Sequence, residues 1–269
     1  MFYDLIMPIP ERLNPAFASS GTPMALSPER IEEARRLLIV ALDAPTAAAA
    51  LDLVNKLERH CLWFKVGLEL FTAAGPDFLE PLAARGHSLF LDLKLHDIPN
   101  TVAGAVRTAA ALGVRMLTLH ALGGPAMLSA ARNALEGISN PPELLAVTVL
   151  TSMDAGQLQA IGIGSSPAKQ AELLARMGLA AGIRGFVCSP QEAASLRALT
   201  GPEGVLVVPG IRPAGGQAAD QKRIATPADA IQAGASYLVV GRPITQAPDP
   251  AEAAEAILHQ MAAVIVPQP

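Results

Sequence analysis

The chain has 269 residues, a length that a single α/β barrel domain commonly fills. Hydrophobic residues make up 51% of the chain and charged residues only 16%, so a large buried core can form. The net charge is −4 and no basic run stands out, which argues against a nucleic-acid partner but not against a small anionic ligand.

The first 26 residues stand outside any repeating pattern, and we treat residues 1–26 as an N-terminal extension, either disordered or the product of an early start codon. Ser27 followed by Pro28 is typical of a helix N-cap and first turn. Residues 28–36 are therefore predicted to form a helix that precedes the main domain, which spans residues 27–269.

Short apolar runs rich in Val, Ile, Leu and Phe recur after this helix, and they are too short for typical buried helices. We predict eight strands, at residues 37–43, 62–68, 88–95, 114–121, 144–152, 183–190, 205–212 and 236–243. Between them lie segments with apolar residues at three- and four-residue spacing, such as 45–58, 192–199 and 251–264, which predict helices.

Eight strand–helix units predict a single (β/α)8 TIM barrel. The alternative is an open, doubly wound sheet, which binds dinucleotides through a Gly-rich loop after its first strand. The sequence at that point is LDAPTAA, which has no such loop.

Two charges fall within the third predicted strand, where apolar residues are expected. Side chains alternate across a strand, so Asp92 and Lys94 share one face while Leu91, Leu93 and Leu95 share the other. Burying an ion costs several kcal/mol, so a purely structural ion pair is the weaker interpretation. Active sites of barrels lie at the carboxyl ends of the strands, which favours a catalytic role.

Further charges fit the same end of the barrel. Lys65 lies in the second predicted strand, and Asp43 closes the first. Asp43 could instead cap the following helix, and Lys65 could extend to solvent. Together with Asp92, Lys94 and Asp97 they form an alternating set of acids and ammonium groups, which packing alone rarely requires.

Arginines follow the last two strands, at the positions where barrels commonly bind phosphate. Arg212 stands on the loop at the end of the seventh predicted strand, and Arg242 on the loop at the end of the eighth, where Gly241 opens the last helix. Either arginine alone could be a solvated surface charge, but both at these positions predict a phosphate site. Residues 209–227 are rich in Gly and Ala and are predicted to form a mobile lid that carries Gln221.

The segment LDLKLHDIPNTV closely resembles the signature of the bacterial orotidine 5′-phosphate decarboxylase family. Further similar segments occur in the same order over roughly residues 35–260: ALD at Asp43, FKVGLELF at Lys65, VTVLTSMD at Thr151 and Ser152, VPGIRPAGG at Arg212, DQKR at Gln221, and VVGRPI at Gly241 and Arg242. The Asp-x-Lys-x-x-Asp pattern alone occurs in a wider set of phosphate-binding barrels, whereas the full ordered set is specific.

The resemblance implies a homodimeric lyase that converts orotidine 5′-monophosphate (OMP) to uridine 5′-monophosphate (UMP) and CO2, the last step of de novo UMP biosynthesis, without cofactor or metal. It implies that Lys94 donates the proton, with Asp92, Lys65 and Asp97 completing the catalytic set and Asp97 reaching the partner's site. The implied substrate-binding residues are Asp43, Lys65, Asp92, Ile98, Thr101, Thr151, Ser152, Pro209, Arg212, Gln221, Gly241 and Arg242.

That chemistry suits these residue types. Loss of CO2 from pyrimidine C6 leaves an electron pair with no adjacent sink, so an ammonium group that stabilises the charge and supplies a proton is required. His96 and His120 could serve as general acids by residue type, but the resemblance implies structural or rim-positioning roles for them.

Three alternatives remain at this stage. Sugar-phosphate lyases of the same barrel group share the Asp-x-Lys-x-x-Asp segment but use Mg²⁺ and typically carry an acid where Lys65 stands. A Schiff-base aldolase would need Lys94 as a neutral amine, whereas neighbouring aspartates favour the ammonium form. A non-catalytic phosphate-binding barrel would be expected to lack one or more of the four charged residues.

The sequence also bears on localisation. No apolar stretch approaches the roughly 18 residues of a membrane span, and the N-terminus lacks the basic start of a signal peptide. We therefore expect a cytoplasmic protein without a membrane partner. Cys61 and Cys188 each adjoin an apolar run and are expected to be buried free thiols.

Overall fold

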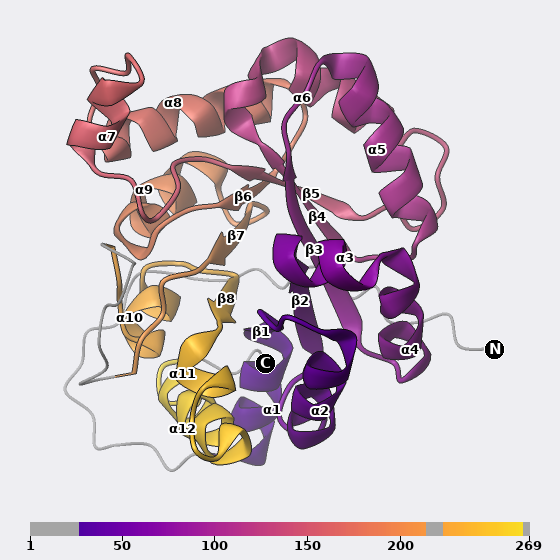
Figure 1. Cartoon of the computed structure of the whole chain (residues 1–269). Helices are drawn as coiled ribbons and strands as arrows, with labels where there is room; N and C mark the ends of the chain where they lie inside the picture. Colours follow the sequence, from indigo (N-terminus) through magenta and orange to yellow (C-terminus); the bar gives the residue numbers. More distant parts are fainter. Residues whose placement is uncertain (1–26, 214–222, 266–269) are drawn as a thin grey trace.

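A computed structural model describes residues 27–213 and 223–265 (Figure 1). Eight parallel strands form a closed barrel in which β1 pairs with both β2 and β8, so the predicted TIM barrel is confirmed and the open sheet is excluded. The strands are β1 (Leu38–Ala41), β2 (Trp63–Gly67), β3 (Ser88–Leu95), β4 (Met116–His120), β5 (Glu143–Val147), β6 (Gly185–Val187), β7 (Val205–Val208) and β8 (Tyr237–Val240).

Helices surround the barrel, and many of them begin with a proline, whose fixed φ suits the first turn and whose missing N–H is not needed there. They are α1 (Pro28–Leu37), α2 (Ala47–Leu57), α3 (Leu68–Ala74), η1 (Pro76–Phe78), α4 (Leu79–Ala84), α5 (Pro99–Ala111), η2 (Ala121–Gly123), α6 (Gly124–Asn133), α7 (Ala155–Ala160), α8 (Pro167–Ala180), α9 (Pro190–Thr200), α10 (Pro227–Gln232), α11 (Arg242–Thr245) and α12 (Pro250–Ala262).

The predicted first helix is confirmed, with the Ser27 side chain accepting a hydrogen bond from the amide of Arg30. The fifth strand ends earlier than predicted, at Val147, because the chain then turns away from the barrel. The helix predicted over 251–264 is confirmed as α12, whereas Gly241 opens α11, a separate short helix before it. Residues 1–26 and the middle of the predicted lid, 214–222, lie outside the described residues.

Apolar side chains fill the barrel on both sides of the sheet. A large cluster packs between strands and helices, and it includes Leu91 of β3, with Leu93 and Leu95 partly buried against it, as predicted. A smaller cluster fills the barrel interior, where layers of side chains are expected. Its members are Ile39, Ala41, Phe90, Met116, Leu145, Val205, Val207 and Val239.

Helices α1 and α12 lie side by side and bring the two ends of the described domain together (Figure 1). The buried guanidinium of Arg30 on α1 donates hydrogen bonds to the carbonyl of Ile265, at 2.6 and 2.8 Å, and to that of Ala263 at 3.1 Å. Ala263 is the C-cap of α12, whose carbonyl has no partner within the helix, and Ile265 lies just beyond it.

Both cysteines are buried and free, as predicted. Burial raises the pKa of the Cys61 thiol to about 12, and burial followed by the charge of Glu192 raises that of Cys188 further, so neither is a ready thiolate. Among the helices of the described segments, none is long and apolar enough to cross a membrane.

Candidate active site

Strand alternation places charges directly above the apolar interior of the barrel. Asp43, Lys65 and Asp92 each follow an inward-facing residue by two positions, at the carboxyl ends of β1, β2 and β3. The carboxyl ends of all eight strands form one rim, called here the carboxyl rim. The interior below is filled by side chains, so these groups face a cavity at the rim.

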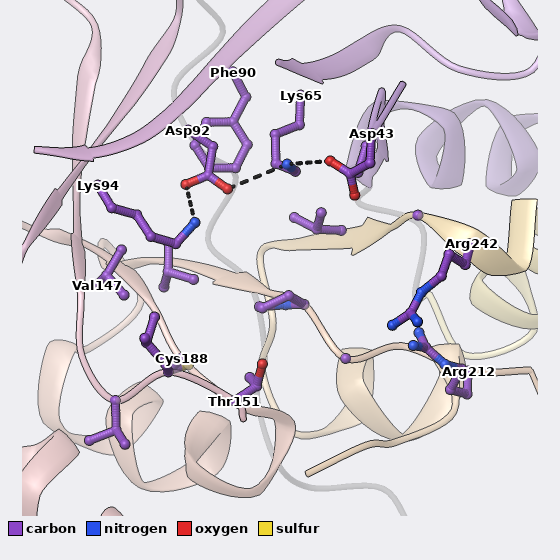
Figure 2. A pocket seen from close by; sticks show the side chains of 18 residues that line it. Asp43, Lys65, Phe90, Asp92, Lys94, Val147, Thr151, Cys188, Arg212 and Arg242 are labelled. Carbon is purple, nitrogen blue, oxygen red and sulfur yellow. Dashed lines mark hydrogen bonds and ion pairs between the residues drawn. The ribbon is translucent and has the colours of Figure 1, made fainter. Parts of the chain in front are cut away.

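Four of the predicted residues form a continuous chain of alternating charge (Figure 2). Lys65 Nζ lies 3.1 Å from Asp43 Oδ1 and 3.5 Å from Asp92 Oδ2, and Lys94 Nζ lies 2.8 Å from Asp92 Oδ1. The side chains of Lys65 and Asp92 are only 11% exposed, whereas that of Lys94 is 32% exposed. Lys94 is thus the ammonium group that a bound molecule can reach, braced from behind by Asp92.

Asp92 is held in its ionised form. Burial alone disfavours a carboxylate, but the ammonium groups of Lys65 and Lys94 and hydrogen bonds from Lys94 and Thr118 outweigh it, so the pKa of Asp92 lies below its usual value.

The geometry also decides between the alternative roles of Asp43 and Lys65. Asp43 contacts Lys65 and does not cap α2, whose N-cap is Thr46, and Lys65 is buried instead of extending to solvent.

Lys94 reaches the cavity through an irregularity in β3. Its φ is 50°, in the left-handed region that non-glycine residues seldom adopt, and the pairing of β3 with β4 shifts register between Leu91 and Leu95. The fully buried hydroxyl of Thr118 on β4 accepts a hydrogen bond from the Lys94 amide at 2.8 Å. The same hydroxyl donates to Asp92 Oδ1 at 2.9 Å.

The charged chain lines one end of a cavity of about 380 Å³. Its wall includes Phe90, Val147, Val149, Val187 and Val239, from four different strands or the turns after them. An apolar wall with a few convergent polar groups is the usual form of a small-molecule site. It also lowers the local dielectric, which strengthens the electrostatic effect of the lysines on a bound charge.

Two arginines lie at the opposite end of the cavity, as predicted, and point toward each other from the segments after β7 and β8 (Figure 2). Arg212 is 8% exposed, and burial together with the Arg242 guanidinium lowers its pKa. Two neighbouring cations favour an anion between them, and planar guanidinium groups match the oxygens of phosphate. This end of the cavity is therefore suited to an anionic group of the ligand.

The other predicted ligand-binding residues differ in how they lie relative to the cavity. Thr151, Pro209 and Gly241 line the cavity. Ser152 is exposed, beside Thr151 in the turn after β5, and is not part of the lining. Gln221 lies outside the described residues, and its contact with the phosphate stays a prediction.

Three predicted residues face outward. Asp97, Ile98 and Thr101 are exposed at the start of α5, and Asp97 Oδ1 accepts a hydrogen bond from the Ile98 amide at 2.6 Å. None of them lines the cavity of their own chain. The prediction that they act in a partner's site is compatible with this exposure and remains a prediction.

His96, in the signature segment, and His120, at the end of β4, stack on each other, with ring centroids 5.4 Å apart. Burial, followed by the charges of His96 and Lys94, lowers the pKa of His120 to about 4, so this ring is neutral at pH 7. His120 caps η2 by accepting from the Leu122 amide. Neither histidine lines the cavity.

Sequence reasoning missed Thr118 and Gly67. Thr118 follows the interior residue Met116 by two positions, so strand alternation alone could have identified it as a polar residue facing the site. A Cβ at Gly67 would lie 2.8 Å from Lys65 Nζ, so the absence of a side chain there leaves room for the ammonium group. No local pattern indicates that contact.

The closed barrel and the charged cavity at its carboxyl rim define a (β/α)8-barrel enzyme. Residues 36–257 match the model of the orotidine 5′-phosphate decarboxylase / HUMPS family, to which the chain therefore belongs. A protein from Nitrosococcus oceani named orotidine 5′-phosphate decarboxylase is 53% identical over 220 residues, covering 82% of this chain and 95% of that protein. One of the same name from Aliivibrio fischeri is 51% identical over 229 residues, covering 85% and 98%.

Solved structures agree with this assignment. The crystal structure of orotidine 5′-phosphate decarboxylase from Lactobacillus acidophilus matches with a TM-score of 0.74 and 40% sequence identity, covering 84% of this chain and 99% of that one. An uncharacterized conserved protein from Geobacillus kaustophilus matches with a TM-score of 0.73 and 33% identity, covering 83% and 99%.

Proposed function

We propose that this protein decarboxylates OMP to UMP and CO2, without a cofactor, as the last step of UMP synthesis. The single observation that carries the proposal is the shared cavity: it holds an ammonium group braced by a carboxylate at one end and two arginines at the other. A nucleotide monophosphate presents a reacting ring and a phosphate dianion at its two ends. The names of the curated relatives support the same substrate.

Lys94 is the proposed proton donor. The bond between C6 and the carboxylate carbon breaks, CO2 leaves, and the electron pair stays on C6 in the plane of the ring. Lys94 Nζ, held 2.8 Å from Asp92 Oδ1, stabilises that charge and transfers a proton to C6. Lys94 is left neutral and regains its proton from water, so the cycle needs no other reactant.

Asp92 is proposed to face the substrate carboxylate. Its pKa is lowered, so it is ionised when the substrate binds, and two anions held close repel each other until neutral CO2 departs. Ground-state stress of this kind is a contested explanation of rate. An Asp92→Asn variant with an unchanged kcat would show that repulsion by Asp92 does not contribute to the rate.

The remaining contacts follow from the two ends of the cavity. Asp43 and Lys65 are proposed to hold the ribose hydroxyls, beside the charged chain, while Thr151 and Ser152 recognise the amide edge of the base. Arg212 and Arg242 bind the phosphate, with Gln221 as a further proposed contact. Pro209 and Gly241 supply backbone surface at the same end, where both line the cavity.

The proposal includes a homodimer in which Asp97, Ile98 and Thr101 complete the partner's site. Large apolar side chains are exposed after three successive strands of the barrel: Leu68 is 56% exposed, Ile98 66% and Leu122 38%. Apolar groups gathered at one part of a surface favour an interface. This one adjoins the carboxyl rim, where a partner's residues could approach the cavity.

Complementation between two inactive variants tests the dimer. Lys94→Ala removes the proton donor and Asp97→Ala removes the residue given to the partner. Mixed dimers contain one intact site, so mixing the two variants after subunit exchange should restore about a quarter of wild-type activity per chain. No recovery in dimers shown to be mixed would contradict the shared site.

The Mg²⁺-dependent sugar-phosphate lyases are the competing class, and the family description includes HUMPS enzymes. A cation site there would need free carboxylates, whereas Lys65 lies between Asp43 and Asp92 and is paired with both. The chemistry of this cluster therefore favours the decarboxylase.

A spectrophotometric assay of OMP consumption tests the proposed reaction. Purified protein in buffer with chelator and no added metal should consume OMP, and Lys94→Ala should reduce kcat by at least about 10³-fold. A hexulose phosphate with Mg²⁺ serves as the rival substrate. Turnover of that sugar phosphate with none of OMP would overturn the proposal.

A further inference from the structure

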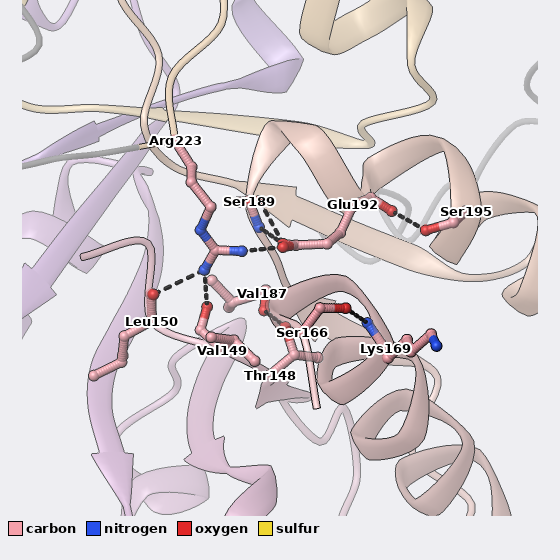
Figure 3. Close-up of polar contacts among 10 residues, drawn as sticks. All are labelled: Thr148, Val149, Leu150, Ser166, Lys169, Val187, Ser189, Glu192, Ser195 and Arg223. Atoms are coloured by element: carbon pink, nitrogen blue, oxygen red, sulfur yellow. Dashed lines mark hydrogen bonds and ion pairs between the residues drawn. The ribbon is translucent and has the colours of Figure 1, made fainter. Parts of the chain in front are cut away.

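A buried ion pair lies beside the cavity, outside its lining (Figure 3). Arg223 is 6% exposed and Glu192, on α9, is 2% exposed, and their side chains are in direct contact. Neither residue has a role in the proposed reaction. A buried pair of this kind adds little net stability, because the loss of hydration offsets the attraction. The pair therefore matters chiefly for the backbone segments that it holds in place.

On one side, Arg223 holds the turn that faces the base. Its Nη2 donates to the carbonyls of Val149 and Leu150, at 3.1 and 2.8 Å. These carbonyls lie beyond the end of β5 and immediately before Thr151, which lines the cavity. The guanidinium thus supplies the hydrogen bonds that a neighbouring strand no longer provides.

Glu192 ties this arrangement to the segment after β6. Its carboxylate accepts from the Ser189 amide at 2.9 Å and from the Ser189 hydroxyl, and these contacts close a capping box at the start of α9. Ser189 follows Cys188, which also lines the cavity. The carboxylate is therefore anchored to a rigid helix end, and Arg223 is anchored to it.

On the other side, Arg223 precedes the short pairing that supports the phosphate end. Ala225 forms an isolated bridge with Ile211, its carbonyl accepts from the Arg212 amide at 2.9 Å, and its own amide donates to the Gly210 carbonyl at 3.3 Å. Only one residue, Ile224, lies between Arg223 and this bridge. Fixing Arg223 therefore fixes the backbone that presents Arg212.

We propose that Arg223 is a positioning residue that holds the turn at Thr151 and the segment at Arg212 at a set separation. The inference rests on the proposed function, in which these two places meet the base and the phosphate of one nucleotide. A ligand that spans two subsites gains affinity only when both fit together. Loosening Arg223 should therefore weaken binding of the whole nucleotide far more than binding of its parts.

The test is calorimetric titration of Arg223→Met with UMP, which needs no turnover, alongside competition by uridine and by inorganic phosphate. Kd for UMP should rise at least about tenfold, with the two fragments changed by less than about twofold. Arg223→Met leaves the buried carboxylate of Glu192 unpaired, which could impair folding. The double variant Glu192→Leu/Arg223→Met avoids that unpaired charge and should show the same pattern of binding.

Arg30→Met is the matched control. Arg30 is likewise a buried arginine whose guanidinium donates to two backbone carbonyls, but those belong to Ala263 and Ile265, beside α12. The Arg30→Met variant should leave UMP affinity unchanged even if it lowers the melting temperature. Unchanged UMP affinity in Arg223→Met would overturn the inference, as would a loss of fragment binding equal to that of UMP.

Amide hydrogen exchange separates this inference from the proposed function. The amides of Met153 and Arg212 donate to the carbonyls of Leu150 and Ala225, on the two sides of the linkage. Both amides should exchange faster in Arg223→Met than in the wild type, and neither should do so in Arg30→Met. This expectation does not depend on which substrate the protein binds. Wild-type protein that binds no UMP would refute the proposed function, while faster exchange at only one of the two amides would refute the linkage.

Discussion

The backbone amide of Lys94 donates to the side-chain hydroxyl of Thr118, across the irregular pairing of β3 and β4. A hydroxyl that accepts this bond keeps its own hydrogen for Asp92 Oδ1, 2.9 Å away. One buried side chain thereby supports the left-handed backbone of Lys94 and orients the carboxylate that pairs with its ammonium group. Residues held in such backbone conformations persist only where their surroundings enforce them.

Thr118→Val should therefore impair the reaction. Valine has nearly the same shape, but it leaves the Lys94 amide unpaired and removes a donor from Asp92, at a cost of about 1–3 kcal/mol in the free energy of unfolding. We expect kcat/KM for OMP to fall by about tenfold to a hundredfold through misplacement of Lys94, as measured by steady-state assay.

A double-mutant cycle distinguishes this role from simple destabilisation. Thr118→Ser keeps the hydroxyl and should retain activity within about threefold. In the background of Asp92→Asn, Thr118→Val should cost much less than it does alone, because the two residues act through one contact. Fully additive losses, or a serine variant as impaired as the valine variant, would argue against a positioning role for the Thr118 hydroxyl.

Gly67→Ala should separate activity from stability. The new Cβ would lie 2.8 Å from Lys65 Nζ and 3.5 Å from Asp43 Oδ1, so the flexible end of Lys65 must move away. The backbone at Gly67, with φ −97° and ψ −175°, is accessible to alanine. We expect a change below about 1 kcal/mol in the free energy of unfolding and a fall of at least about tenfold in kcat/KM.

Gly164→Ala is the control for this variant, because a Cβ there meets nothing within 4 Å. It should leave both activity and urea unfolding unchanged. Wild-type activity in Gly67→Ala would mean that the position of the Lys65 ammonium has no bearing on the reaction.

Arg242→Ala should act on binding at the phosphate end. Losing charge-assisted hydrogen bonds to a dianion costs about 3 kcal/mol, which corresponds to a rise of about a hundredfold in KM for OMP. The effect should be much smaller for competition by uridine, which lacks the phosphate. A change in KM below about threefold would count against the assignment of this end of the cavity.

His120 predicts a pH dependence of stability. Its pKa is lowered from 6.5 to about 4 in the folded protein, so the unfolded chain binds more protons at this residue between those values. The free energy of unfolding is thus unaffected above about pH 6.5 and declines as the pH falls toward 4. Urea unfolding of His120→Asn, which keeps an acceptor for the Leu122 amide, should show a shallower decline. Equal slopes for variant and wild type would disprove the contribution of His120.

Much of the site could be predicted because strands and turns are local features. Eight apolar runs predicted the barrel, and the two-residue period placed Asp92 and Lys94 on one face, toward the cavity where their side chains meet. Local reasoning left open whether Asp43 caps the following helix, because its residue type suits a cap; in the structure Thr46 caps α2. The fifth strand was predicted too long because its apolar composition continues into the turn.

The contacts that the sequence did not reveal join residues far apart in the chain. Arg223 pairs with Glu192, 31 positions away, and donates to Val149, 74 positions away, while Thr118 meets Asp92 across 26 positions. No local pattern in the sequence indicates which of these residues meet. Their pairing depends on which loops the closed barrel brings side by side.

By itself, then, the order of residues determined the barrel, the inward direction of the charged strand residues and the two loops that carry the arginines, since periodicity and turn chemistry act over a few neighbours. Only the tertiary structure decided which charges touch, how Lys94 leaves the regular strand, and how one guanidinium joins two rim segments. Those outcomes follow from barrel closure, which sets distances between strands that no local pattern encodes.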